Sequence, residues 1–273
     1  MPKLDINDVE LFYDERGAGA ETIVFAHGLL LSGRMFERQI DVLSREYRCI
    51  AFDARTHGRS QITKVGLDLD TQADDAIALI ERLEAAPCNF VGLSMGGFVG
   101  LRVALKRPEL LRSLILLDSS ADAEPQFWKF RLMSGVARWL SPRLVLDSLF
   151  RSLLGARFRR DPARAAEREF WRGQMLANDV ESMSVCIREV LSRRPLIDEI
   201  GRIAVPTLIV VGEEDRVTPP EQSRRMQQRI SGAKLVTLPG TGHVSSIESP
   251  EAVTRAIEQF LAALATEKLH RPA

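Results

Sequence analysis

The stretch Val91-Gly92-Leu93-Ser94-Met95-Gly96-Gly97 decides the fold. An apolar run precedes it and a helical pattern follows it, so the serine falls on a turn between a strand and a helix. On such a sharp turn the serine oxygen is exposed, and side chains in place of Gly92 and Gly96 would crowd the backbone. The first amides of the helix point at the same place. We therefore predict that Ser94 is a nucleophile, the alternative being an incidental serine in a glycine-rich turn.

Short apolar runs rich in β-branched residues alternate with helical patterns along most of the chain. Their nearly continuous apolar character is typical of strands that helices cover on both faces. The opening segment, residues 3–14, alternates polar and apolar residues and indicates an antiparallel hairpin at the sheet edge. We predict an α/β fold with a mostly parallel sheet flanked by helices. The main predicted strands are residues 22–25, 47–52, 89–93, 114–117, 207–211 and 235–238.

The alternation is interrupted between residues 122 and 201, which show helical patterns and no strand pattern. Asp161-Pro162 is a typical helix start, and Gly155 is placed where a helix ends. An insertion between two parallel strands lies above their carboxyl ends, where such sheets bind ligands. We predict a core domain of residues 1–121 and 202–273 with an all-helical cap, or lid, of residues 122–201. Its expected helices are residues 125–140, 142–154, 162–177 and 180–193.

A second motif, Ala26-His27-Gly28-Leu29-Leu30, directly follows the predicted strand 22–25. A loop at this place can supply one of two backbone amides that stabilise an oxyanion, and the residue after the nucleophile supplies the other. Those amides would belong to Leu29 and Met95. Because backbone groups would act here, we expect His27 to be a structural hydrogen-bonding residue.

Two loops beyond the last two predicted strands carry the expected partners of Ser94. The strand 207–211 ends in an acidic turn, where Asp215 is favoured as the acid over its neighbours Glu213 and Glu214. A glycine-flanked histidine, His243, follows the last strand and suits a general base. Of the other histidines, His57 is expected on a surface turn and His270 near the end of the chain.

The chain order Ser94, Asp215, His243, with each residue after a separate strand, is the order expected for one hydrolase fold. These residues resemble the α/β-hydrolase superfamily over nearly the whole chain, most closely capped serine esterases and lactonases with a Gly-Leu-Ser-Met-Gly-Gly motif. Some members place the acid after the preceding strand, which is Asp118 here. The family turn Asp-x-Arg-Gly-His-Gly-x-Ser carries Thr56 in place of its glycine, which leaves the shape of that turn open.

The resemblance implies hydrolysis of a small carboxylic ester through an acyl-enzyme, with His243 as base and Asp215 orienting it. Lactonase, carbon–carbon bond hydrolase and perhydrolase activities would use the same triad, and a ligand receptor of this fold is the non-enzyme alternative. Dehalogenases and epoxide hydrolases of the fold use an aspartate nucleophile, which Ser94 excludes. Substrate-binding residues are expected at Trp128, Met133 and Val217.

The composition places further limits on the function. Lys plus Arg and Asp plus Glu both number 37, so nothing indicates nucleic acid or an anionic membrane as partner. Three widely spaced cysteines fit a reducing compartment, no apolar run reaches the roughly 18 residues of a membrane span, and the opening residues lack a secretory signal. We expect a cytoplasmic protein that binds a small-molecule ester and water, without metal or cofactor, and whose oligomeric state is open.

Overall fold

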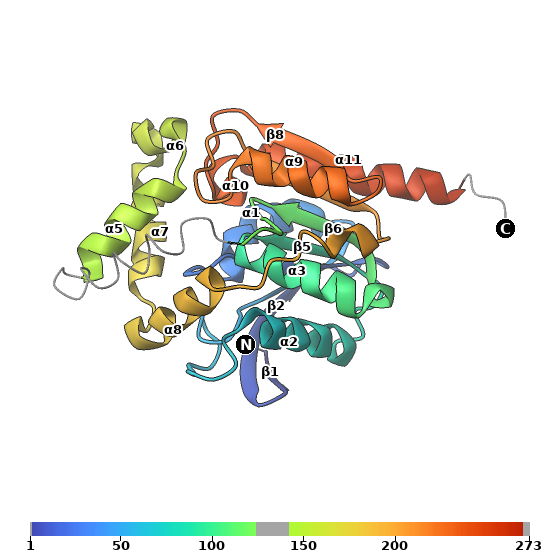
Figure 1. Cartoon of the computed structure of the whole chain (residues 1–273), viewed down its shortest axis with the longest axis horizontal. Coiled ribbons are helices and arrows are strands. Elements are labelled where there is room, and N and C mark those ends of the chain that lie inside the picture. Colours follow the sequence, from blue (N-terminus) through green and yellow to red (C-terminus); the bar gives the residue numbers. More distant parts are fainter. Residues whose placement is uncertain (1, 124–141, 270–273) are drawn as a thin grey trace.

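The computed structural model describes residues 2–123 and 142–269 and has an eight-stranded sheet at its centre (Figure 1). The strand order is β1-β2-β4-β3-β5-β6-β7-β8. β1 and β2 form an antiparallel hairpin at one edge, and the strands from β4 to β8 in this order pair in parallel. The predicted α/β fold with a mostly parallel sheet is confirmed. The strands are β1 (Lys3–Ile6), β2 (Val9–Arg16), β3 (Thr22–Ala26), β4 (Arg48–Phe52), β5 (Cys88–Leu93), β6 (Leu111–Leu117), β7 (Thr207–Gly212) and β8 (Lys234–Leu238).

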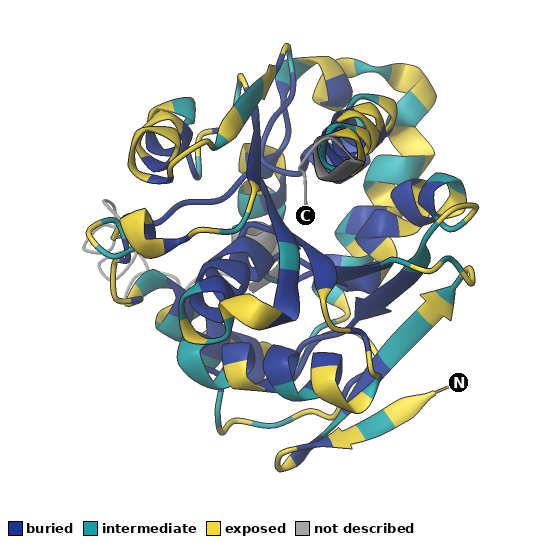
Figure 2. Cartoon of the chain, turned by 90° about the vertical axis from the view of Figure 1, so that its right-hand side faces the viewer, coloured by how far each residue is buried: buried dark blue, intermediate teal, exposed yellow. Residues whose placement is uncertain are grey.

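Helices lie on both sides of the sheet and bury its central strands (Figure 2). Every residue of β3, β5 and β7 is buried, which explains why their sequences are mostly apolar rather than alternating. Helices α2 and α3 pack together, as do α1 and α11. The flanking helices are α1 (Glu37–Leu43), α2 (Leu69–Arg82), α3 (Met95–Lys106), α9 (Pro220–Arg229), α10 (Ser245–Glu248) and α11 (Pro250–Leu269).

The segment between β6 and β7 is helical wherever the structure describes it. It contains α5 (Pro142–Leu153), α6 (Ala156–Arg160), α7 (Ala165–Leu176) and α8 (Val180–Leu191). Helices α5, α6 and α7 stand together beside the sheet, at the left of Figure 1. The expected helix at 125–140 lies outside the described residues. Sequence reasoning missed α6, because five residues, three of them arginine, carry no apolar periodicity.

Candidate active site

Ser94 occupies the turn between β5 and α3. Its φ of 50° and ψ of −111° lie in a region that residues with a side chain rarely adopt. A Cβ atom at Gly92 would meet the Gly96 carbonyl, and a Cβ atom at Gly96 would meet the Ala26 carbonyl. Both glycines are therefore needed for this tight turn, as the motif predicts. The Ser119 hydroxyl donates to the Ser94 carbonyl oxygen at 3.1 Å and so helps to hold the turn in this conformation.

His243 follows β8 and links Ser94 to Asp215. Its Nε2 atom lies 2.9 Å from Ser94 Oγ, and its Nδ1 atom lies 2.9 Å from Asp215 Oδ2. A carboxylate only accepts, so Nδ1 carries the proton and Nε2 is the acceptor for the serine hydroxyl. The structure thus brings the three predicted residues into one chain of hydrogen bonds, at the edge where the parallel strands end.

Asp215 is held rigidly by its own turn. Its Oδ1 atom accepts from the amides of Val217 and Thr218 at 2.8 and 3.0 Å, and Oδ2 accepts from Thr218 Oγ1 at 2.8 Å. Sequence reasoning missed Thr218, although an aspartate followed by threonine three residues later is a typical local hydrogen-bonded turn. The predicted residue Val217 contributes its backbone amide here, and its side chain is half-buried.

Asp118, the alternative acid, follows β6 and is completely buried. Its Oδ1 atom accepts from the Gly212 amide at 2.9 Å and its Oδ2 atom from the Ser245 amide at 2.8 Å. Burial, and next the charge of Asp215, raise the pKa of Asp118 to about 8. Asp118 therefore ties β7 to α10 and makes no hydrogen bond to His243, so the geometry favours Asp215 as the orienting acid.

The pKa of His243 reflects several opposed effects. Burial lowers the pKa, because it disfavours the charged imidazolium. The charge and hydrogen bond of Asp215, with further contributions from Asp118 and Glu248, outweigh burial, so the net pKa of His243 is raised. A base of raised pKa accepts a proton more readily from Ser94, and it loses this capacity when acid protonates the ring.

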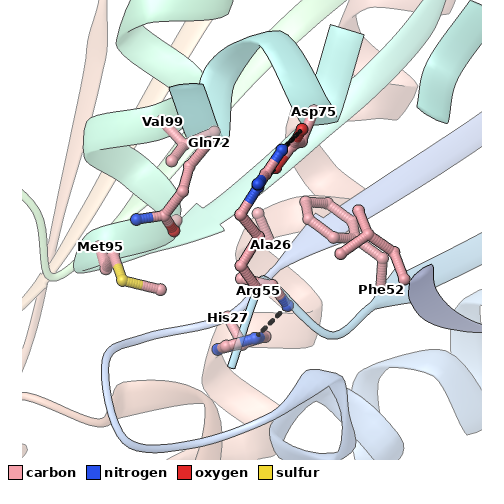
Figure 3. A pocket seen from close by; sticks show the side chains of 11 residues that line it. Ala26, His27, Phe52, Arg55, Gln72, Asp75, Met95 and Val99 are labelled. Atoms are coloured by element: carbon pink, nitrogen blue, oxygen red, sulfur yellow. Dashed lines mark hydrogen bonds and ion pairs between the residues drawn. The ribbon is translucent and has the colours of Figure 1, made fainter. Parts of the chain in front are cut away.

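The loop after β3 lies directly beside Ser94. A Cβ atom at Gly28 would be 3.7 Å from the Ser94 Cβ atom. His27 holds the loop, because its Nδ1–H donates to the Gly28 carbonyl at 2.8 Å. Its Nε2 accepts from the Ala54 amide at 2.9 Å, and this hydrogen bond is dashed beside the labelled His27 in Figure 3. Burial lowers the pKa of His27 to about 4, which keeps the ring neutral in this structural role.

The two predicted oxyanion amides belong to the residues that follow Gly28 and Ser94, where the two loops approach each other. Leu29 belongs to the loop that His27 holds, and Met95 is the first residue of α3. Among the described residues, neither amide has a hydrogen-bond partner. Unpaired amides next to a nucleophile suit the stabilisation of a negatively charged oxygen.

An apolar cavity lies between the helical segment and the loops that flank Ser94. On one side it adjoins Val244, in the loop of residues 239–244 that carries His243 and is called the histidine loop below. On another side it adjoins Leu31, in the loop that follows β3. Sequence reasoning missed this site, since apolar spacing on α5 and α7 predicts a packed core equally well. The predicted binding residues Trp128 and Met133 lie outside the described residues. The cavity is lined by Leu31, Phe150, Leu153, Leu154, Phe158, Trp171, Met175, Val244 and Ile247.

Two kinds of feature are not found in the described parts of the chain. No group of three or more histidine, cysteine, aspartate or glutamate side chains there could hold a metal ion. Likewise, no helix within residues 2–123 and 142–269 has the length and apolar character needed to cross a membrane.

Comparison with known proteins identifies the family. The model of the α/β hydrolase fold family matches residues 21–250, so the chain belongs to that family. A thermophilic esterase from Thermogutta terrifontis has 27% identity and a TM-score of 0.88, with 97% of this chain and 99% of that one covered. The enol-lactonase from Burkholderia xenovorans LB400 has 27% identity and a TM-score of 0.87 over 96% and 100%. The 3-oxoadipate enol-lactonase 2 of Acinetobacter baylyi is 26% identical over 94% and 95%. The chain is a hydrolase of this family.

Proposed function

We propose that this hydrolase is a serine esterase that cleaves small carboxylic esters with an apolar acyl group. The observation that carries the proposal is the chain of hydrogen bonds from Ser94 Oγ through His243 to Asp215, with both links at 2.9 Å. Each partner occupies the position that nucleophilic acyl transfer requires, because the base reaches the nucleophile and the acid orients the base.

The proposed reaction proceeds in two steps. His243 Nε2 takes the Ser94 proton while Oγ attacks the ester carbonyl, and the amides of Leu29 and Met95 stabilise the resulting oxyanion. Asp215 stabilises the imidazolium, which then protonates the leaving alcohol. Water attacks the acyl-enzyme with His243 again as base, and this releases the acid and restores Ser94.

The substrate preference follows from the apolar cavity. Its lining side chains carry no charge and turn apolar atoms toward the cavity, so burial of hydrocarbon is the main favourable interaction that it can provide. Because the cavity adjoins the residue after His243, we place the acyl group there and the alcohol toward the other side of Ser94.

A lactonase is the second candidate. A lactone is a cyclic ester, so the same steps open it, and both enol-lactonases described above align with nearly the whole chain. Measurement of kcat/KM for acyl esters, lactones, vinylogous diketones and peracid formation separates the candidates. We expect acyclic esters to be the best substrates. A lactone preferred by two orders of magnitude would reassign the enzyme, and turnover of none of them would favour the ligand receptor.

We also propose that residues 122–201 act as a cap over this site, in a cytoplasmic enzyme. Contacts on two sides of Ser94 support the cap: Asn178 Nδ2 donates to the Leu30 carbonyl at 2.9 Å, and the His243 amide donates to the Leu153 carbonyl at 2.7 Å. The three cysteines are free and buried, which fits a reducing compartment.

Acyl-chain preference tests the cavity assignment. For the wild type, kcat/KM should rise from acetate to about butyrate or hexanoate, since each buried methylene contributes about 0.8 kcal/mol, and then fall. Phe150→Leu enlarges the cavity and should move the optimum to longer chains. Phe260→Leu is the matched control, because Phe260 is equally buried but lies on α11. If Phe150→Leu and Phe260→Leu had the same optimal acyl-chain length, the acyl group would have to bind outside this cavity.

A further inference from the structure

Glu248, at the end of α10, is a buried carboxylate that the proposed reaction does not use. Glu248 is 7% exposed, although no lysine or arginine side chain within residues 2–123 and 142–269 forms an ion pair with it. Instead the carboxylate accepts hydrogen bonds from three backbone amides. Oε2 lies 2.8 Å from the Gly155 nitrogen, and Oε1 lies 3.1 and 3.4 Å from the nitrogens of Gly242 and Val244. Two of these amides belong to the residues on either side of His243.

The third amide comes from a distant part of the chain. Gly155 precedes α6 in the helical segment, 93 positions away from Glu248. Glu248 therefore joins the histidine loop to that segment. The backbones approach so closely that a Cβ atom at Gly242 would meet both the Gly155 nitrogen and the Leu153 carbonyl oxygen. The glycine before His243 thus permits the contact, and the carboxylate holds it closed.

A carboxylate suits this place better than a neutral group. Both of its oxygens accept, and both are occupied by amides that would otherwise be buried without partners. Burial raises the net pKa of Glu248 above its usual value, and the amides of Gly155, Gly242 and Val244 act in the opposite direction, because they favour the charged form. That charge lies near His243 and adds to the effect of Asp215 and Asp118 on the imidazole.

We propose that Glu248 is a positioning residue, whose carboxylate fixes the backbone on both sides of His243 against the helical segment and so aligns Nε2 with Ser94 Oγ. This role rests on the proposed function, because alignment matters only if His243 acts as the base. A small displacement of a catalytic group lowers the rate strongly, whereas it changes substrate binding little.

Two substitutions separate the reach of the side chain from its charge. Glu248→Gln keeps the shape, removes the charge and turns an NH₂ group toward a backbone amide. It should lower kcat by about 10- to 100-fold with KM changed less than about threefold, and it should lower the pKa of His243. Glu248→Asp keeps the charge but is one methylene shorter, so it should lower kcat while the pKa of His243 stays near the wild-type value.

Glu214→Gln is the matched control. Glu214 Oε2 accepts from the Ala156 amide at 2.6 Å and so binds the same helical segment. Glu214 contacts the histidine loop through its backbone amide, which donates to the Thr241 carbonyl at 2.8 Å, and the substitution leaves that hydrogen bond in place. We expect Glu214→Gln to keep kcat within about twofold, as for substitutions away from critical features. A loss equal to that of Glu248→Gln would show that any tether of the segment matters, and would overturn the specific role of Glu248.

The measurements are kcat, KM, the acid limb of the kcat/KM profile and the His243 pKa from NMR titration of the free protein. If Glu248→Gln keeps kcat within about twofold and leaves that pKa unchanged, the proposal is wrong. If this variant does not fold, Glu248→Asp decides by its kcat at constant pKa. The NMR titration needs no substrate, so inactivity of the wild type toward esters would refute the proposed function while the pKa shift still tests the placement of Glu248.

Discussion

Replacing Ser94 with alanine should lower kcat for an activated ester such as p-nitrophenyl butyrate by about 10⁴-fold or more, with little change in Tm. The serine hydroxyl makes one hydrogen bond in the described structure, to His243, so its loss removes the nucleophile and little stabilising contact. Steady-state kinetics and a thermal melt on the same preparation measure both quantities. Activity above about 1% of the wild type would contradict a serine mechanism.

Ser113→Ala provides the opposite pattern as a control. Ser113 lies near the amino end of the interior strand β6, away from the carboxyl ends of the strands that carry the site. It donates to Asn89 Oδ1 at 2.8 Å in a buried pair. Its removal leaves the Asn89 oxygen without a partner, which costs about 1–3 kcal/mol. We expect a lower Tm with unchanged kcat. The two serine variants together separate loss of chemistry from loss of stability.

Replacing Asp215 with asparagine should lower kcat by about 10⁴-fold, the second largest effect expected. Asparagine can retain the amide contacts of Val217 and Thr218, but its NH₂ group no longer accepts the Nδ1–H of His243. The imidazole then carries its proton on Nε2 instead of Nδ1, so Nε2 cannot accept the proton of Ser94. The imidazolium also loses the negative charge that stabilises it.

Asp118→Asn is the matched comparison, because Asp118 is also buried and also near His243. It should lower kcat less than about tenfold, since Asp118 contacts the amides of Gly212 and Ser245 rather than the imidazole. Its Tm should fall, because one of those amides would face an NH₂ group. A larger loss of kcat in Asp118→Asn than in Asp215→Asn would move the orienting acid to the end of β6.

Features that depend on local sequence were predictable. The apolar runs at 22–25 and 207–211 correspond to β3 and β7, because a strand buried on both faces requires such a run. The strained turn at Ser94 followed from its two glycines. The carboxyl-end positions of Asp215 and His243 followed from the sheet, since parallel strands end at one edge.

Features that depend on long-range packing were not predictable. His57 was expected on a surface turn, and this was wrong: it is completely buried, and its ring centroid lies 5.0 Å from that of His27. Asp53 folds the turn inward, since it accepts from the amides of Gly33 and Arg59. Thr56 adopts a φ of 71°, so it takes the backbone conformation for which the family uses glycine.

Glu248 illustrates the same limit within the site. Its position after a histidine loop gives no signal, because its most distant partner, Gly155, precedes a helix that sequence periodicity does not reveal. The sequence favoured Asp215 as the acid and offered Asp118 as the alternative, as both follow strands that end near Ser94. Their hydrogen bonds distinguish them, and these depend on atomic positions.

The most direct test of the central claim is covalent labelling of the nucleophile with a serine-directed alkyl phosphonate. We predict one phosphonate per chain, carried by the tryptic peptide of residues 83–102, in which Ser94 is the only serine. Labelling should abolish ester hydrolysis and be absent from Ser94→Ala. Loss of activity with the phosphonate on any other residue, or equal labelling of the Ser94→Ala variant, would contradict Ser94 as the nucleophile.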